Sequence, residues 1–388
     1  MRELSGAALD PLDIATGVAF GLVADPPPLP DPAPNVADAL EDVLVRMLAR
    51  PPCLVAFSGG HDSSAALAIA TRAARRHGLD PPVPITYRLP RHPAATEDDY
   101  QDTVIAHLGL DDWIRIEVDD ELDCVGDWAR DAVARIGLRW PFNTFFMLPL
   151  ARRAAGGSLV TGFGGDELLA PGTHDRALAL LTGRARPRRA DARALRRALA
   201  PRAKRERTAA REASPPAWLT PAGEAEYRRR AGELRGRARL SYERELLDDT
   251  WPSRYVQQAR ASLAAVGEAA GTEVCGLFAE PEVIVTLARR HGRRGPRSRA
   301  AVLGAACGDT LPASFFERTT KAEFNTGFWG PRARAFAAAA DPERLEVDRE
   351  LVDPARLVER WRRPDPDARS FLLAQACAFA GERVTPGR

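Results

Sequence analysis

The first half of the chain alternates short, continuous apolar runs with longer amphipathic stretches. Residues 53–57 (CLVAF) contain no charged or strongly polar position, which is typical of a strand buried on both faces of a parallel sheet. Further strands are predicted near residues 84–88, 113–118 and 158–161. Helices are predicted over residues 36–48, 63–77, 98–108 and 149–155. This alternation favours an α/β fold with a doubly wound, mainly parallel sheet, in which ligands bind at the carboxyl ends of the strands.

The remaining segments differ in composition. A proline-rich stretch within residues 1–35 predicts a short N-terminal piece followed by a stiff linker, and residues 36–182 then form the α/β core. Residues 183–250 are dense in arginine and poor in aromatic residues, which favours a solvated helical insertion over a nucleic-acid surface. Capture of an acidic or phosphorylated substrate by these arginines is the alternative. Residues 251–388 are predicted to be helical.

Length and charge narrow the classes of protein that remain. The 388 residues exceed what one hydrophobic core usually supports, so we expect one large domain with appendages or two domains. The 55 basic and 53 acidic residues nearly cancel, which gives no overall field that would attract nucleic acid or an anionic membrane. Neither a signal peptide nor an apolar run of roughly 18 to 20 residues is found. The five cysteines are scattered without a CxxC spacing, so we expect a soluble protein of the reducing cytoplasm.

A glycine- and serine-rich turn follows the first predicted strand: Ser58, Gly59, Gly60, His61, Asp62, Ser63 and Ser64. Two glycines allow a tight turn whose amide N–H groups point into one concavity, and the following helix N-terminus adds positive potential, so the segment can bind phosphate. It matches neither the Walker A loop nor the dinucleotide fingerprint. A carboxylate within an anion site is explained if Mg²⁺ bridges Asp62 to phosphate oxygens. The alternative is an ordinary serine-capped turn. Under both interpretations His61 is a spacer within the turn.

Two further places carry candidate chemistry. A second glycine-rich turn over residues 161–167 follows another predicted strand and holds Asp166, where a second magnesium ligand belongs. By itself this turn could be structural. Lys204 and Lys321 are the only lysines of the chain, and every other basic residue is arginine. A lysine retained against such a bias suggests a role that requires a compact ammonium group, although Lys321 could also be a surface charge.

These motifs resemble the N-type ATP pyrophosphatases and, within them, the synthetase domain of the asparagine synthetase family. The sequence SGGHDSS at residues 58–64 is similar to the SGGxDSS pyrophosphate loop, and TGFGGDE at residues 161–167 is similar to SGEGxDE. Residues 275–281 resemble a degraded PFLDP segment. Leu311 with Arg318, Lys321 and Phe324 resembles the LPxS…R…K…F stretch. Residues 10–26 resemble the connector that follows the glutaminase domain of the family.

The resemblance implies a fold of the adenine-nucleotide α-hydrolase type, also called the PP-loop type, with ATP and Mg²⁺ as cofactors. Lys321 would stabilise charge on the α-phosphate, and Asp62 and Asp166 would hold the magnesium. The pyrophosphate contacts would come from Ser58, Gly59, Gly60, Ser63 and Ser64. The adenine would lie near Ala56, Phe57, Thr86 and Tyr87, and the nucleotide site would be completed by Gly162 and Gly164.

Two departures from the family pattern shape the expected function. Arg2 stands where the family has its glutaminase nucleophile, and the chain has no room for that domain. Nitrogen is therefore expected as free ammonia, from a partner protein, or as an amine on the substrate. Phe163 replaces the family glutamate, and an apolar ring offers neither proton transfer nor a polar contact, which disfavours plain aspartate amidation. The glutamate-free form resembles divergent relatives in peptide and natural-product pathways, including the lasso-peptide macrolactam synthetases.

The predicted function is an ATP-dependent ligase that adenylates a carboxylate, releases pyrophosphate and lets an amine attack, with little covalent protein chemistry. The substrates would be a carboxylate and an amine or ammonia, either as small molecules or as groups on a peptide, with no nucleic-acid or membrane partner. An ammonia-dependent amidase of a small acid is an alternative. Another adenylating enzyme, for tRNA or sulfur transfer, is disfavoured because paired cysteines are missing. A silent nucleotide-binding subunit is disfavoured by the presence of Asp62, Asp166 and Lys321.

Overall fold

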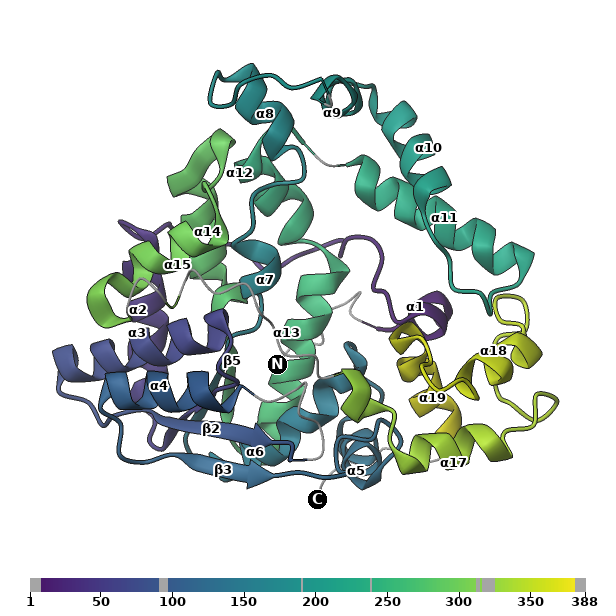
Figure 1. Cartoon of the computed structure of the whole chain (residues 1–388), viewed down its shortest axis with the longest axis horizontal. Helices are drawn as coiled ribbons and strands as arrows, with labels where there is room; N and C mark the ends of the chain where they lie inside the picture. Colours follow the sequence, from purple (N-terminus) through teal and green to yellow (C-terminus); the bar gives the residue numbers. More distant parts are fainter. Residues whose placement is uncertain are drawn as a thin grey trace.

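A single parallel sheet organises the computed structural model, which describes residues 8–90, 97–189, 191–237, 239–311, 315 and 325–380 (Figure 1). The sheet has five strands in the order β3-β2-β1-β4-β5, and every pair is parallel. The strands are β1 (Cys53–Ala56), β2 (Val83–Arg88), β3 (Ile114–Glu117), β4 (Ser158–Thr161) and β5 (Glu273–Gly276). The order reverses between β1 and β4, so the carboxyl ends of these two central strands open the crevice where such sheets bind ligands.

Alternate residues of the strands enter two separate cores, one on each face of the sheet. Leu54, Ile85 and Leu159 pack into one core, while Val55 and Val160 pack into the other. The first face is covered by α5 (Asp127–Ile136), α6 (Met147–Arg153) and the carboxyl half of α13 (Arg254–Ala270). The second face is covered by α2 (Val36–Leu48), α3 (His61–His77), α4 (Asp98–Leu108), α14 (Pro281–His291) and α15 (Arg299–Cys307). The expectation of a doubly wound α/β fold is confirmed.

The helix boundaries follow local sequence signals. The side chain of Asn35 accepts a hydrogen bond from the backbone N–H of Asp38 and caps α2, as the sequence predicts. Gly78 ends α3 in a left-handed conformation with φ of 64°. The C-terminal half is largely helical, as predicted, but it also contains β5, which the sequence analysis did not predict. This edge strand has four residues, and its first two positions are not fully buried, so it shows no apolar run.

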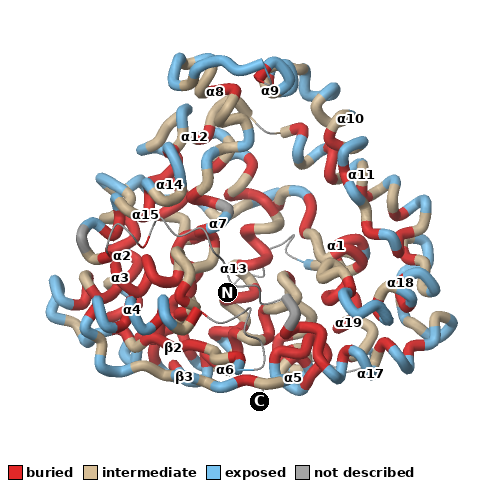
Figure 2. Tube along the Cα trace, in the orientation of Figure 1, coloured by how far each residue is buried: buried red, intermediate tan, exposed pale blue. Residues whose placement is uncertain are grey.

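The remaining helices extend away from the sheet. A series of helices runs along one side of the molecule, and Figure 2 shows that their outer surfaces are largely exposed, whereas buried positions gather around α3, α13 and the sheet (Figures 1 and 2). This series consists of α8 (Asp175–Leu181), α9 (Asp191–Ala198), α10 (Arg202–Glu212) and α11 (Pro221–Gly236). The other helices are α1 (Pro11–Thr16), α7 (Gly165–Leu168), α12 (Tyr242–Arg244), α17 (Pro331–Ala339), α18 (Pro354–Trp361) and α19 (Phe371–Ala378). No helix among the described residues is long and apolar enough to cross a membrane.

The N-terminal piece is packed against the helices that follow the α/β core. Asp13, at 0% exposure, lies 2.5 Å from Nη2 of Arg254 at the start of α13. The proline-rich stretch is bound as well, because the backbone N–H of Ala33 donates to Oγ1 of Thr286 in α14 at 2.9 Å. The indole N–H of Trp251 donates to the carbonyl oxygen of Pro27 at 2.8 Å. These contacts hold the stretch predicted as a linker against the body of the protein.

Candidate active site

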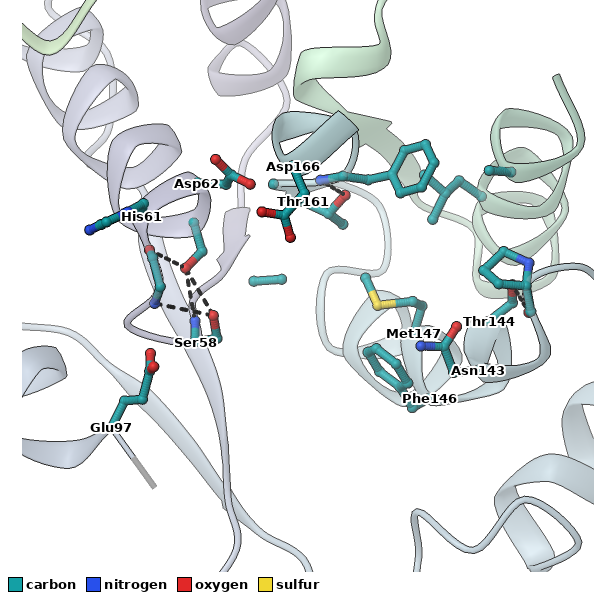
Figure 3. A pocket seen from close by; sticks show the side chains of 18 of the residues that line it. Ser58, His61, Asp62, Glu97, Asn143, Thr144, Phe146, Met147, Thr161 and Asp166 are labelled. Atoms are coloured by element: carbon teal, nitrogen blue, oxygen red, sulfur yellow. Dashed lines mark hydrogen bonds between the residues drawn. The ribbon is translucent and has the colours of Figure 1, made fainter. Parts of the chain in front are cut away.

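A cavity of about 750 Å³ lies at the carboxyl ends of β1 and β4, between the turns that follow the two strands. The turn after β1 contributes Ser58, Gly60, Asp62 and Ser63, and the turn after β4 contributes Gly162 and Asp166. Figure 3 shows Asp62 and Asp166 facing each other across this junction. Two segments about 100 residues apart in the chain thus form one site, as the parallel sheet predicts.

The turn after β1 is closed by its own serine hydroxyls. Oγ of Ser63 accepts a hydrogen bond from the backbone N–H of Ser58 at 3.2 Å and donates to the carbonyl oxygen of Gly60 at 3.1 Å. The backbone N–H of Gly60 donates to Oγ of Ser58 at 3.4 Å. Gly59 has φ of 88°, a conformation that L-residues rarely adopt. The turn is thus held in a fixed shape directly before the N-terminus of the 17-residue helix α3, whose positive potential favours a phosphate.

The two carboxylates share one cation. Nη2 of Arg299 lies 2.6 Å from Oδ1 of Asp62, and its Nε donates to the same oxygen at 3.0 Å. Nη1 of Arg299 pairs with Oδ1 of Asp166. Arg299 is the first residue of α15 and lines the cavity. Sequence reasoning missed it, because arginine is the common basic residue of this chain and the contact spans 237 positions.

Glycines allow the two turns to approach closely. A Cβ added to Gly165 would lie 2.1 Å from Cγ of Asp62, and one added to Gly162 would lie 3.0 Å from the backbone N of Ser63. Neither position could carry a side chain without displacing the turn after β1. Gly164 has φ of 93° and contacts Ala279 instead of lining the cavity.

Not all predicted nucleotide-site residues reach the cavity. Those that line it are Ala56, Ser58, Gly60, Asp62, Ser63, Gly162 and Asp166. Phe57, Gly59, Ser64, Tyr87 and Gly164 do not belong to its lining. Ser64 is 0% exposed, and its Oγ has no hydrogen-bond partner among the described residues. Lys321, Arg318 and Phe324 lie outside the described residues.

Tyr87 and Thr86 support the cavity from behind. The hydroxyl of Tyr87 donates to the carbonyl oxygen of Phe146 at 2.7 Å, and burial raises the pKa of this phenol. The Phe146 ring lines the cavity at the end of a short 3₁₀ helix, Phe142–Phe146. Oγ1 of Thr86 donates to the carbonyl oxygen of Phe57 at 2.6 Å and accepts from the indole N–H of Trp113 at 3.0 Å. Both side chains therefore fix the walls on the β2 side.

The start of α4 covers the turn after β1. Nε2 of Gln101 donates to the carbonyl oxygen of Ser58 at 2.8 Å, and Glu97 lines the cavity at 6% exposure. A Cβ at Gly59 would lie 2.9 Å from Cγ of Gln101, so this packing requires the glycine. Sequence analysis missed both side chains. Two polar residues four positions apart at the start of a helix, on its buried face, are the signal that could have revealed them.

His61 has a specific contact. Its Nε2 donates to the carbonyl oxygen of Phe315 at 3.0 Å, and the two rings pack edge to face with centroids 5.3 Å apart. The imidazole thus connects the turn after β1 to Phe315, which precedes Lys321 by six positions in the sequence.

The residues present fit a magnesium ion and a nucleotide phosphate. Asp62 and Asp166 already converge on one positive charge, and carboxylate oxygens are the ligands that Mg²⁺ prefers beside phosphate oxygens. The N-terminus of α3, which favours an anion, begins directly after the turn that carries Ser58 and Gly60.

Comparison with known proteins gives one family. The family model described as asparagine synthase matches residues 35–377. The matched range includes both turns, all five strands and Arg299. No curated protein matches the chain.

Proposed function

The chain belongs to the asparagine synthase family, and from this premise we propose that it forms an amide through an acyl-adenylate, releasing AMP and pyrophosphate. The family gives the general activity, an ATP-dependent ligase that joins a carboxylate to an amine or ammonia. The observation that carries the proposal is the convergence of Asp62 and Asp166 on Arg299 beside the phosphate-binding turn. Two carboxylates placed next to an anion site are explained by a metal-bound polyphosphate.

In the first step, an oxygen of the substrate carboxylate attacks the α-phosphorus of ATP, and the bond to the bridging oxygen of pyrophosphate breaks. The N–H groups of the turn after β1 bind the departing pyrophosphate, and Ser58 and Ser63 hold that turn in place. Asp62 and Asp166 would hold Mg²⁺, which neutralises charge on the phosphate oxygens. By the family resemblance, Lys321 would stabilise charge at the α-phosphate.

In the second step, an uncharged amine nitrogen, either on the substrate itself or as ammonia, attacks the acyl carbon. The bond to the AMP oxygen breaks with its electron pair on AMP, and the proton that the nitrogen loses passes to the departing AMP phosphate or to water. Phe163 lines the cavity beside Gly162 and cannot accept that proton. The same apolar position supports a substrate other than free aspartate, and we place the enzyme in peptide or natural-product biosynthesis, with formation of a macrolactam or isopeptide bond as the reaction type.

The test is exchange of labelled pyrophosphate into ATP, together with chromatographic detection of AMP, in the presence of candidate acids. Exchange that is lost in Asp62→Ala and Lys321→Ala but retained in Lys204→Ala supports adenylation. Lys204, in α10, is the matched control because it is the only other lysine of the chain. Formation of ADP and phosphate in place of AMP and pyrophosphate would contradict the proposal. Binding of ATP with no product would favour a subunit without turnover.

A further inference from the structure

The cavity has two chemically different ends. At one end lie its charged lining residues. They are Asp62 and Asp166 in the turns after β1 and β4, Glu97 at the start of α4, and Arg299 at the start of α15. Figure 3 shows Asp62, Glu97 and Asp166 on one side and Asn143, Phe146 and Met147 across from them. Among the described lining residues, the opposite end has no acidic, lysine, arginine or histidine side chain, and its polar groups are neutral.

The residues that line the apolar end form two groups, one on each side of it. Phe146 and Met147 lie on the β2 side, where Tyr87 packs on Phe146 with ring centroids 6.2 Å apart. That side is where the resemblance places the adenine. The other side is formed by the turn after β4, by α13 and by the residue that precedes the 3₁₀ helix. We call this side the acyl pocket, and it consists of Pro141, Phe163, Tyr255, Ala259 and Leu263.

Stacked rings fix one wall of the acyl pocket. Phe163 stacks on Tyr255 with an interplanar angle of 21° and centroids 6.4 Å apart. Tyr255 in turn packs edge to face on Trp140 at 4.8 Å. Because Phe163 follows Gly162 directly, this aromatic wall begins next to the turn that carries Asp166. The rings therefore offer an apolar surface to the substituent of a carboxylate that binds at the charged end.

Leu263 forms the wall of the acyl pocket that lies farthest from the charged end. A second cavity of about 190 Å³, lined by Arg46, Arg260, Glu273 and Glu280 among others, lies behind it, and Leu263 lines both cavities. A Cβ added to Gly276 would lie 3.1 Å from Cδ1 of Leu263 and 3.2 Å from Cδ1 of Phe163. The two side chains thus meet over Gly276 and separate the acyl pocket from the charged groups behind it.

We propose that the acyl substrate is a carboxylic acid whose substituent is apolar and uncharged, either aromatic or aliphatic, and that Leu263 limits its length. This inference rests on the proposed function, since it identifies the acid that is adenylated. Free aspartate would have to place an ammonium and a second carboxylate against the acyl pocket, whose described side chains carry no charge, and buried charges without partners are strongly disfavoured. An apolar substituent loses water contact on entry, which favours binding.

Saturation-transfer NMR of the full chain with ATP and magnesium measures binding of 3-phenylpropionate, hexanoate, octanoate and aspartate, and pyrophosphate exchange measures their adenylation. We expect the apolar acids to bind and to exchange at least about 100-fold faster than aspartate, because the aspartate charges would lack partners. Binding of apolar acids without exchange would support the acyl pocket as their binding site and would refute the proposed adenylation. Exchange with aspartate and none with apolar acids would retain the adenylation and overturn the inference.

Two variants test the pocket itself. Leu263→Ala opens the acyl pocket toward the second cavity, so the preference should shift from hexanoate to octanoate by about 10-fold or more, the size expected for added methylene groups. Ala259→Phe fills the pocket and should abolish binding of 3-phenylpropionate while the protein still binds ATP. Leu181→Ala, at an exposed position in α8, is the control and should leave the chain-length profile unchanged. An unchanged profile in Leu263→Ala with normal folding would overturn the inference.

Discussion

Oδ1 of Asp62 accepts a hydrogen bond from Nε of Arg299 at 3.0 Å and forms an ion pair with Nη2 of the same guanidinium at 2.6 Å. The same guanidinium pairs with Asp166, so it lies between the two carboxylates that the family resemblance assigns to magnesium. The Arg299 guanidinium and Mg²⁺ cannot both occupy the space between these oxygens. Arg299 must therefore give up at least part of these contacts when a metal binds.

The first prediction is that Arg299→Ala strengthens magnesium binding in the absence of nucleotide. Without the guanidinium, the two carboxylates repel each other, and a metal ion bound between them relieves that repulsion. Differential scanning calorimetry should show a lower Tm than wild type in chelator and a larger rise on adding MgCl₂. Saturation at about 100 times the Kd corresponds to about 2.7 kcal/mol of stabilisation.

The matched control for that experiment is Arg297→Ala, which removes an exposed arginine two positions away, just before the same helix. It should respond to magnesium as wild type does. If Arg299→Ala and wild type show the same magnesium-induced rise, the guanidinium does not compete with the metal.

The second prediction concerns the contact between the two turns. Gly165→Ala places a Cβ 2.1 Å from Cγ of Asp62, so the carboxylate must move. Displacement of a positioning group by about 1 Å costs about 100-fold in rate, and pyrophosphate exchange should fall by that order while the far-ultraviolet circular dichroism spectrum is retained. Gly304→Ala is the control, because nothing lies within 4 Å of an added Cβ there. That variant should keep its activity and gain about 0.5–1 kcal/mol as a helical glycine replaced by alanine.

The part of the site that was predictable from sequence is the part that is local in the chain. Residues 58–64 form one turn directly after an apolar run, and residues 161–167 repeat that arrangement, so pattern and motif place Asp62 and Asp166 at neighbouring strand ends. Arg299 was not predictable in this way. Its role depends on where α15 packs, and one arginine among many carries no local signal.

The acyl pocket and β5 were missed for related reasons. Tyr255, Ala259 and Leu263 recur at helical spacing in α13, and such a stripe predicts a core face whether or not a cavity lies against it. The strand Glu273–Gly276 pairs with β4 alone and begins with an exposed glutamate, so its sequence lacks the continuous apolar run that marks β1. Only the three-dimensional packing of these segments distinguishes a cavity wall from a core.

The third prediction is a pH effect from Glu280. Burial raises the pKa of this carboxyl, and the neighbouring Arg260 lowers it only in part. The folded protein therefore binds this proton more tightly than the unfolded chain does. The stability that the neutral carboxyl contributes is fully present below the ordinary pKa of glutamate and is lost as pH rises through the raised, folded-state pKa.

Glu280→Gln keeps the shape of the side chain and removes the ionisation. The difference in unfolding free energy between this variant and wild type, measured in urea, should become more favourable to the variant as the pH rises above the ordinary pKa of glutamate. Glu359→Gln, at a side chain that is 70% exposed, should show no such trend. A difference that stays constant with pH would mean that Glu280 does not titrate differently in the folded protein.

The fourth prediction concerns the docking of the N-terminal piece. Arg254 donates to both carboxylate oxygens of Asp13, at 2.5 Å from Nη2 and 3.2 Å from Nη1, and Asp13 is 0% exposed. Arg254→Met removes the guanidinium and leaves the carboxylate buried without its cation. Loss of one partner of a buried pair costs about 3–5 kcal/mol, and urea unfolding at neutral pH should show a loss of this order.

The same substitution should depend on pH with a definite sign. Burial already raises the pKa of Asp13, and removal of Arg254 raises it further, because the guanidinium is one of the groups that lower it. The destabilisation should therefore be largest at neutral pH and become smaller in acid, where the carboxyl is neutral. Arg356→Ala breaks an exposed pair with Asp353 and should cost about 0–1 kcal/mol at any pH. An equally small loss in Arg254→Met would mean that the N-terminal piece is held by its apolar contacts, such as those of Leu12 and Phe20, and not by the ion pair.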